Sequence, residues 1–115
     1  MQHINQQLED RMLDFSVAVV EHCAKLKQPL IKPLTSQVIR SASSIGANFV
    51  EANNGSSRQD FRNKIFIAKK EANETKYWLR MLQKLGDSTE ELESLLLEVQ
   101  EFIMILQKIT NTLKS

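Results

Sequence analysis

The chain has 115 residues, of which 42% are hydrophobic and 25% are charged, and its formal net charge is +1. This length and composition predict one ordinary globular domain, residues 1–115, that buries a core without disulfides or metal. The single cysteine, Cys23, excludes an intramolecular disulfide, and no apolar run approaches the roughly 20 residues of a membrane-spanning helix.

The N-terminal segment "MQHINQQLEDRM" is polar and lacks the apolar centre of a signal peptide. A lone cysteine also fits a reducing compartment. We therefore expect a cytoplasmic protein with no membrane contact.

The first predicted helix runs from the polar N-terminus to about Lys27 and ends before Pro29, which disfavours helix in the residue preceding it. Apolar residues and one histidine recur along it at spacings of four and three, which is the pattern of an amphipathic helix. They are Leu8, Met12, Phe15, Val19, His22 and Leu26.

The second predicted helix runs from Leu34 to about Asn53, and "RSASSIGANFVEA" within it is crowded with small residues. Gly46 in a helix interior costs about 1 kcal/mol against alanine. Close packing against a neighbouring helix would offset that cost, although simple tolerance of the glycine is the alternative. At the end of this helix, Asn53, Asn54 and Gly55 could adopt a left-handed cap.

The third predicted helix spans about Ser57 to Leu85, with Ser57 as its N-cap and Gly86 as its stop. Ser88 and Glu91 then match the S-x-x-E capping box of a fourth helix. Both helices carry apolar residues at spacings of three and four. No segment alternates with period two, so we expect no strand.

Four amphipathic helices joined by short connections predict an all-α fold, an antiparallel up-down-up-down four-helix bundle. On a heptad fitted to the third helix, several large apolar residues fall outside the core positions. They are Phe66, Ile67, Tyr77, Trp78 and Met81. Leu13, Val17, Val20 and Ala24 form a similar second stripe on the first helix.

An apolar patch of this kind is uncommon on monomers. We therefore expect a homo-oligomer in which the third helix contributes to the subunit interface. The alternative is a skewed bundle whose own core includes these residues.

Two segments in this order, "RSASSIGANFVEA" and "DFRNKIFIAKKEANETKYWLRML", resemble the bacterial family of 23S rRNA-intervening-sequence proteins. The resemblance implies a four-helix bundle without catalytic residues, commonly assembled as a ring-shaped homopentamer. A related branch resembles the accessory protein of diversity-generating retroelements, which binds nucleic acid. Ala52 and Glu71-Ala72 depart from the glycine and Gly-Ser of many relatives, which weakens the transfer of any branch-specific function.

The chain contains no Glu-x-x-His pair of the kind that four-helix bundles use to hold two metals. Glu71 and Glu74 could share one helix face, but they lack histidine partners. We therefore expect no metal, no cofactor and no enzymatic activity. Instead, Arg40 is expected to form a structural ion pair with Glu71 or Glu74, in preference to a contact with phosphate.

Charge is unevenly distributed along the chain. Residues 58–86 hold eight basic and three acidic residues, a net of +5, whereas residues 87–115 have a net of −4. The third and fourth helices could neutralise each other. Alternatively, Arg58 and the seven-spaced Arg62, Lys69 and Lys76 could form a basic track for RNA or DNA.

The sequence thus favours a non-enzymatic, self-assembling scaffold or interaction protein. A nucleic-acid-binding accessory protein is the alternative.

Overall fold

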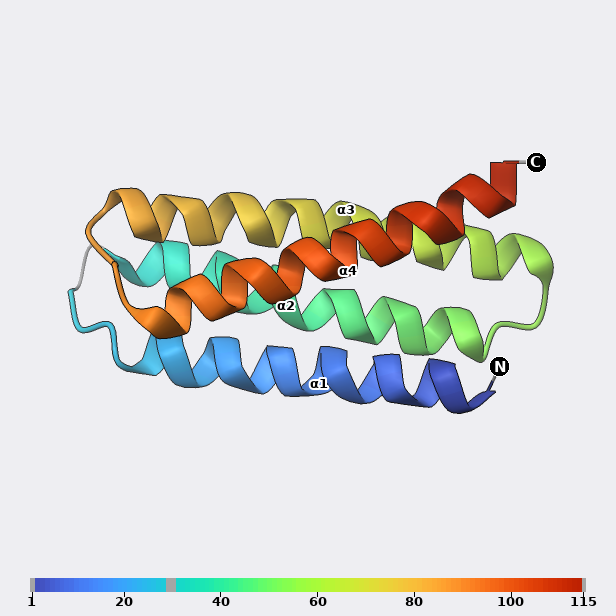
Figure 1. Cartoon of the computed structure of the whole chain (residues 1–115), viewed down its shortest axis with the longest axis horizontal. Helices are drawn as coiled ribbons and strands as arrows, with labels where there is room; N and C mark the ends of the chain where they lie inside the picture. Colours follow the sequence, from blue (N-terminus) through green and yellow to red (C-terminus); the bar gives the residue numbers. More distant parts are fainter. Residues whose placement is uncertain (1, 29–30, 115) are drawn as a thin grey trace.

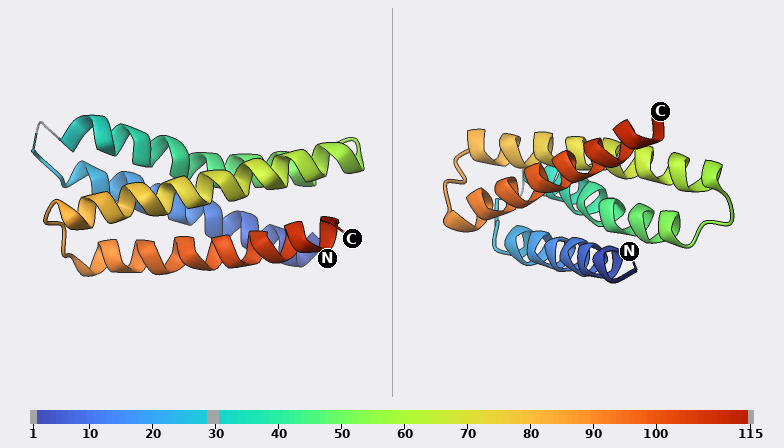
Figure 2. Two further views of the ribbon diagram at one scale, coloured as in Figure 1. Left: turned by 90° about the horizontal axis from the view of Figure 1, so that it is seen from above. Right: turned by 45° about the vertical axis from the view of Figure 1, so that its right-hand side comes forward.

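The computed structural model describes the backbone of residues 2–28 and 31–114. These residues form four long α-helices, arranged side by side with consecutive helices antiparallel (Figures 1 and 2). Their bounds are α1 (Gln2–Ala24), α2 (Lys32–Asn53), α3 (Arg58–Lys84) and α4 (Glu90–Lys114). The predicted all-α, up-down-up-down four-helix bundle is therefore confirmed.

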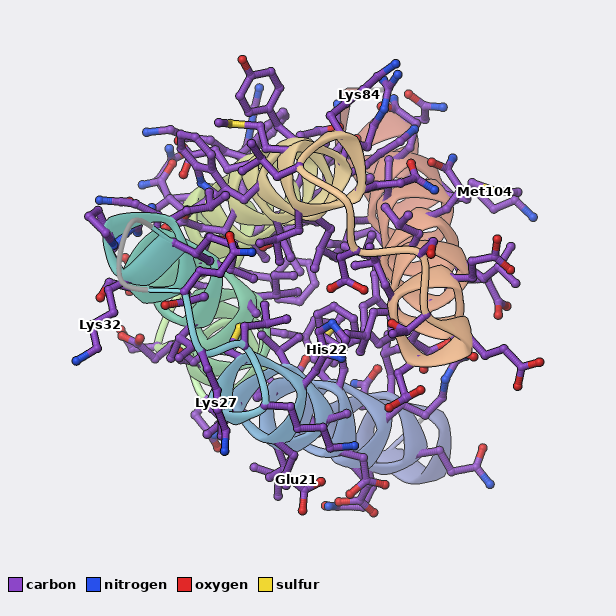
Figure 3. The ribbon with its side chains drawn as sticks, turned by 90° about the vertical axis from the view of Figure 1, so that its left-hand side faces the viewer. Glu21, His22, Lys27, Lys32, Lys84 and Met104 are labelled. Atoms are coloured by element: carbon purple, nitrogen blue, oxygen red, sulfur yellow. The ribbon has the colours of Figure 1, made fainter. Side chains whose placement is uncertain are left out.

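Each helix packs against the next one in the chain, and α4 returns to contact α1 (Figure 3). The pair α2 and α3 has the most extensive contact, and the pair α1 and α4 has the least. The four helices thus form the edges of a square, with the α1–α2 pair opposite the α3–α4 pair. No helix of the described residues is long and apolar enough to cross a membrane.

The core contains the apolar stripes that the spacing predicted, and all four helices contribute to it. Phe15 of α1 meets Phe102 of α4 edge-on, with ring centroids 5.4 Å apart. The largest fully buried side chains include Met12, Ile45, Phe49, Ile65, Leu79, Leu82 and Phe102.

Gly46 allows α1 and α2 to approach closely, as the small-residue pattern predicted. A Cβ atom on Gly46 would lie 3.1 Å from the Cβ of Met12, which is tighter than ordinary carbon contacts. Nearby, the Ser16 hydroxyl donates to the backbone oxygen of Met12 at 3.0 Å. Between α2 and α3, the buried Thr75 hydroxyl donates to Ser41 Oγ at 2.8 Å. Small and hydroxyl side chains therefore line both tight helix contacts of α2.

The helix ends agree with the sequence patterns at both ends of α3 and differ in three other places. Ser57 caps α3 as predicted, because its Oγ accepts the Asp60 N–H at 3.0 Å. However, α1 ends at Ala24 and not near Lys27. The Lys25 and Leu26 N–H groups bond three residues back, to His22 and Cys23, so the helix tightens and stops.

The other two differences concern caps. The left-handed cap expected at the end of α2 is absent, because Asn54 has φ −106° and bonds back to Val50 and Glu51. The left-handed cap occurs instead at Gly86, which ends α3 as predicted: it alone among the described residues has a positive φ, 114°, and its N–H donates to the Gln83 backbone oxygen at 3.1 Å. The capping box of α4 is shifted by one residue: Thr89 Oγ1, not Ser88, accepts the Leu92 N–H at 3.2 Å.

Candidate functional surfaces

Arg40 joins α2 to α3 through two carboxylates, which is the pairing that the sequence predicted. Its two terminal nitrogens lie 3.0 Å from Glu71 Oε2 and 2.9 Å from Glu74 Oε2. Hydrogen bonding to Glu71, and then to Glu74, raises the pKa of Arg40 above its ordinary value. The guanidinium is 48% exposed, whereas the Glu71 side chain is only 12% exposed. This cluster therefore links α2 to α3 at the edge of their contact.

The same pairing leaves Glu71 and Glu74 engaged with a cation of the chain itself. Within residues 2–28 and 31–114, no group of three or more histidine, cysteine, aspartate or glutamate side chains could hold a metal ion. The Oε1 atom of Glu71 is buried and has no hydrogen-bond partner among the described residues.

His22 forms a buried contact that spacing alone did not predict. Its Nε2 lies 2.6 Å from Asp87 Oδ2, and both side chains are almost fully buried. Figure 3 shows His22 pointing from α1 into the interior of the bundle. Asp87 also accepts the Thr89 hydroxyl at 2.8 Å. This pair ties the end of α1 to the α3–α4 connection.

The environment of Asp87 shifts its pKa. Burial raises the pKa of this carboxyl, but hydrogen bonds from His22 and Thr89 together outweigh burial and bring the pKa below its ordinary value. Burial also raises the pKa of the neighbouring Cys23 thiol to about 11, with a smaller contribution from the Asp87 charge. Cys23 is therefore a buried thiol with little thiolate at neutral pH.

The basic residues of α3 are not neutralised by α4. Three acids of α4 pair with Arg11 of α1 or with Lys25, which directly follows α1. Arg11 lies 2.7 Å from Glu98 and 3.5 Å from Glu101, and Lys25 lies 3.1 Å from Glu91. Of the α3 cations in the described chain, only Lys64 forms a salt bridge, with Glu51 of α2. Of the two alternatives for these charges, mutual neutralisation of the third and fourth helices is therefore not supported by a direct ion pair among the described residues.

The four residues proposed for the basic track differ in their surroundings. Arg58 is exposed, and Lys69 is half-buried. The Arg62 guanidinium lies 5.9 Å from the centre of the Phe66 ring. Lys76 donates to Gln100 Oε1 of α4 at 2.7 Å, so its ammonium already has a partner within the chain.

The five residues predicted for a subunit interface also divide into groups. Tyr77 and Ile67 are exposed, at 61% and 40%. Phe66 and Met81 are half-buried. Trp78 is also half-buried, and it packs against the core of its own chain. Its ring meets Tyr77 edge-on at 5.2 Å, and its buried Nε1 has no hydrogen-bond partner among the described residues.

Two grooves on opposite sides of the bundle were missed by the sequence reasoning. One lies between α1 and α2, has a volume of about 620 Å³, and includes Leu13, Gly46 and Val50 in its lining. The other lies between α3 and α4, has a volume of about 410 Å³, and includes Leu96 and Leu97. Leu97 and Met104 of α4 are both exposed. They are seven residues apart and therefore share one helix face, and this spacing was the signal in the sequence for an apolar surface on α4.

Comparison with known proteins supports the sequence resemblance. The profile of the 23S rRNA-intervening sequence protein family matches residues 5–108. A solved structure from Bacteroides thetaiotaomicron, described as a protein of unknown function from the S23 ribosomal protein family, is 37% identical. Its TM-score is 0.78, and the match covers 89% of this chain and 96% of that one. No curated protein matches the chain. By sequence and by fold, this chain belongs to the family of 23S rRNA-intervening sequence proteins.

Proposed function

We propose that the protein is a non-catalytic helical scaffold that assembles with copies of itself. The observation that carries this proposal is the amount of large apolar surface outside the core. The exposed residues include Leu13, Val17, Val20, Ile67, Tyr77, Leu97 and Met104. Fully burying one such side chain contributes roughly 1.5–3 kcal/mol, so covering several of them favours association.

The proposed assembly is a ring-shaped homopentamer in the cytoplasm. The sequence resemblance to ring-forming relatives supports this number of copies, and the exposed apolar residues on three helices support subunit contacts. The assembled surface would serve as a platform beside ribosomal RNA or a nucleic-acid enzyme.

Sedimentation velocity and light scattering on the wild-type protein test the assembly. We expect a species about five times the chain mass of 13.2 kDa at micromolar concentration. Dilution into the nanomolar range serves as the control, because a specific assembly should show a concentration-dependent equilibrium. A stable monomer at micromolar concentration would contradict the proposal.

A second candidate function is polyanion binding, with RNA or DNA as the ligand. Three acids of α4 pair with Arg11 and Lys25, and no salt bridge among the described residues involves the α3 cations Arg58, Lys69, Arg80 and Lys84. Such a cationic helix attracts phosphates without reading bases.

Fluorescence anisotropy with structured RNA and duplex DNA tests this second candidate at two salt concentrations. We expect the logarithm of the binding constant to fall linearly with the logarithm of the salt concentration, with a slope of roughly 0.7–0.9 per phosphate contact. The combined variant Arg58→Gln, Arg62→Gln, Lys69→Gln should lose affinity. A matched control with Lys25→Gln, Lys27→Gln and Lys32→Gln, all outside α3, should not. Affinity that does not change with salt would rule out this mode of binding.

A further inference from the structure

The two apolar grooves lie on opposite sides of the bundle and differ in the sign of the charge at their rims. The α1–α2 groove is lined by three acids, Glu9, Asp10 and Glu51, and by no basic residue, although Glu51 pairs with Lys64 of its own chain. The α3–α4 groove is lined by Lys76 and Arg80 and by one acid, Glu93. Each groove therefore has an apolar floor, with an acidic rim on one side of the molecule and a mainly basic rim on the other.

Each groove includes one leucine that is largely exposed. Leu13 of α1 is 63% exposed and Leu97 of α4 is 71% exposed. The Arg11–Glu98 ion pair spans the α1–α4 contact, which places Leu13 and Leu97 at similar heights along the bundle. Two copies can therefore lie side by side without a large axial shift and bring these leucines together.

We propose that the α1–α2 groove of one copy receives the α3–α4 face of the next copy, with Leu97 packing against Leu13 and Val50. Lys76 and Arg80 then face Glu9, Asp10 and Glu51 of the neighbour. This inference rests on the proposed self-assembly and specifies which surfaces meet.

The physical reasons for a second copy as the occupant are charge complementarity and symmetry. Pairing the α1–α2 groove with itself would bring Glu9 and Asp10 of both copies around one contact, which like-charge repulsion opposes. Pairing unlike faces removes this repulsion and buries leucines from both. A contact between two different surfaces is heterologous, so it leaves one free face on each copy and continues into a ring or a filament.

Two single-face variants provide the test. Leu13→Asp damages the α1–α2 groove, and Leu97→Asp damages the α3–α4 face. Because both leucines are largely exposed, each variant should keep the wild-type helical circular dichroism. Its thermal unfolding should differ from that of the wild type only by the loss of the stabilisation that assembly gives. We expect each variant alone to be monomeric by light scattering.

Mixing the two variants in equal amounts is the decisive measurement. One undamaged groove and one undamaged face remain in the mixture, so the two variants should form a one-to-one heterodimer and stop there. The mass should be about twice 13.2 kDa. The two damaged surfaces both carry an added aspartate and should not pair with each other.

A matched control is Leu85→Asp, at a leucine that is 58% exposed and lines neither groove. This variant should assemble as the wild type does. Wild-type assembly that persists in the Leu97→Asp variant would overturn the inference but leave the proposed self-assembly intact. A monomeric wild type would overturn both. Failure of the two monomeric variants to combine would overturn the heterologous pairing.

Discussion

At the scale of single residues, Gly46 shows that a cost in helix propensity can be offset by packing. The absence of a side chain lets Met12 approach within van der Waals distance of the α2 backbone. The atom that a new side chain would meet is a Cβ, which moves only with the α1 backbone. A larger residue at this position must therefore separate the two helices.

We expect Gly46→Val to lower the free energy of unfolding by about 1–3 kcal/mol, because an overpacked contact forces the backbones apart. Urea titration of the variant and the wild type measures this difference. The control Ser36→Val, at an exposed position of the same helix, should change stability by less than about 0.5 kcal/mol. Equal stability of Gly46→Val and the wild type would show that α1 and α2 adjust without cost.

The buried His22–Asp87 pair is the second residue-scale feature with a measurable consequence. The folded state lowers the pKa of Asp87, so the native protein binds fewer protons there than the unfolded chain. The stabilising contribution is therefore present above the ordinary pKa of this carboxyl and is lost as pH falls through the folded value.

We expect Asp87→Asn to reduce the free energy of unfolding at pH 7 by about 1–3 kcal/mol, because a charged acceptor for His22 is lost. The difference from the wild type should shrink below about pH 4. Denaturant titrations across the acid range measure it. Glu91→Gln removes an exposed carboxylate that also carries a lowered pKa, and it should have a much smaller effect. A difference that is constant with pH would contradict this assignment.

At the scale of helices, the α2–α3 contact is organised by polar groups as well as apolar ones. The Thr75–Ser41 hydrogen bond lies inside it, and the Arg40 cluster lies at its edge. The two carboxylates of that cluster differ in burial, with Glu71 at 12% and Glu74 at 36% exposure. A solvent-exposed ion pair contributes less to stability than one that is shielded from water. The Arg40–Glu71 and Arg40–Glu74 pairs should therefore contribute unequally.

Double-mutant cycles with Arg40→Ala should separate the two ion pairs. We expect a coupling free energy of about 1.5 kcal/mol with Glu71→Ala, as for a hydrogen bond to a charged group. The coupling with Glu74→Ala should be about 0.2–0.5 kcal/mol, as for a surface pair. Chemical denaturation of the single and double variants gives both values. Equal couplings would mean that burial of Glu71 does not strengthen its bond.

At the scale of the whole molecule, the four helix contacts are unequal. The α2–α3 pair is the most extensively packed, whereas α1 meets α4 least closely. The α1–α4 contact depends on the Phe15–Phe102 ring pair and on ion pairs such as Arg11–Glu98. Opening of this contact should therefore cost less free energy than separation of α2 from α3.

We expect Phe102→Ala to destabilise the protein by about 3–5 kcal/mol and to raise amide exchange most strongly in α1 and α4. Hydrogen exchange followed by mass spectrometry locates this change. The control Ser94→Ala, at an exposed position of α4, should leave exchange unchanged. A uniform rise across all four helices would indicate that the bundle opens as one cooperative unit.

Periodicity along the chain predicted the bundle, its core stripes and the Ser57 cap, because these depend on residues within a few turns of one helix. Two sequence motifs indicated the family. The ion pairs of Arg40 were predicted because one arginine and two glutamates, Glu71 and Glu74, lie on neighbouring helices. The spacing of Leu97 and Met104 was also present in the sequence, but the exposure of Leu97 depends on how α3 and α4 lie against each other.

The sequence by itself therefore determined the fold class and the residues that must be buried. The tertiary structure decided which charges meet: Glu98 and Glu101 of α4 pair with Arg11 of α1, and Asp87 meets His22 inside the bundle. It also decided that Trp78 belongs to the edge of the core and that two grooves lie on opposite sides. The reason is geometric, since heptad position fixes the face of one helix but not the rotation of each helix against its neighbours.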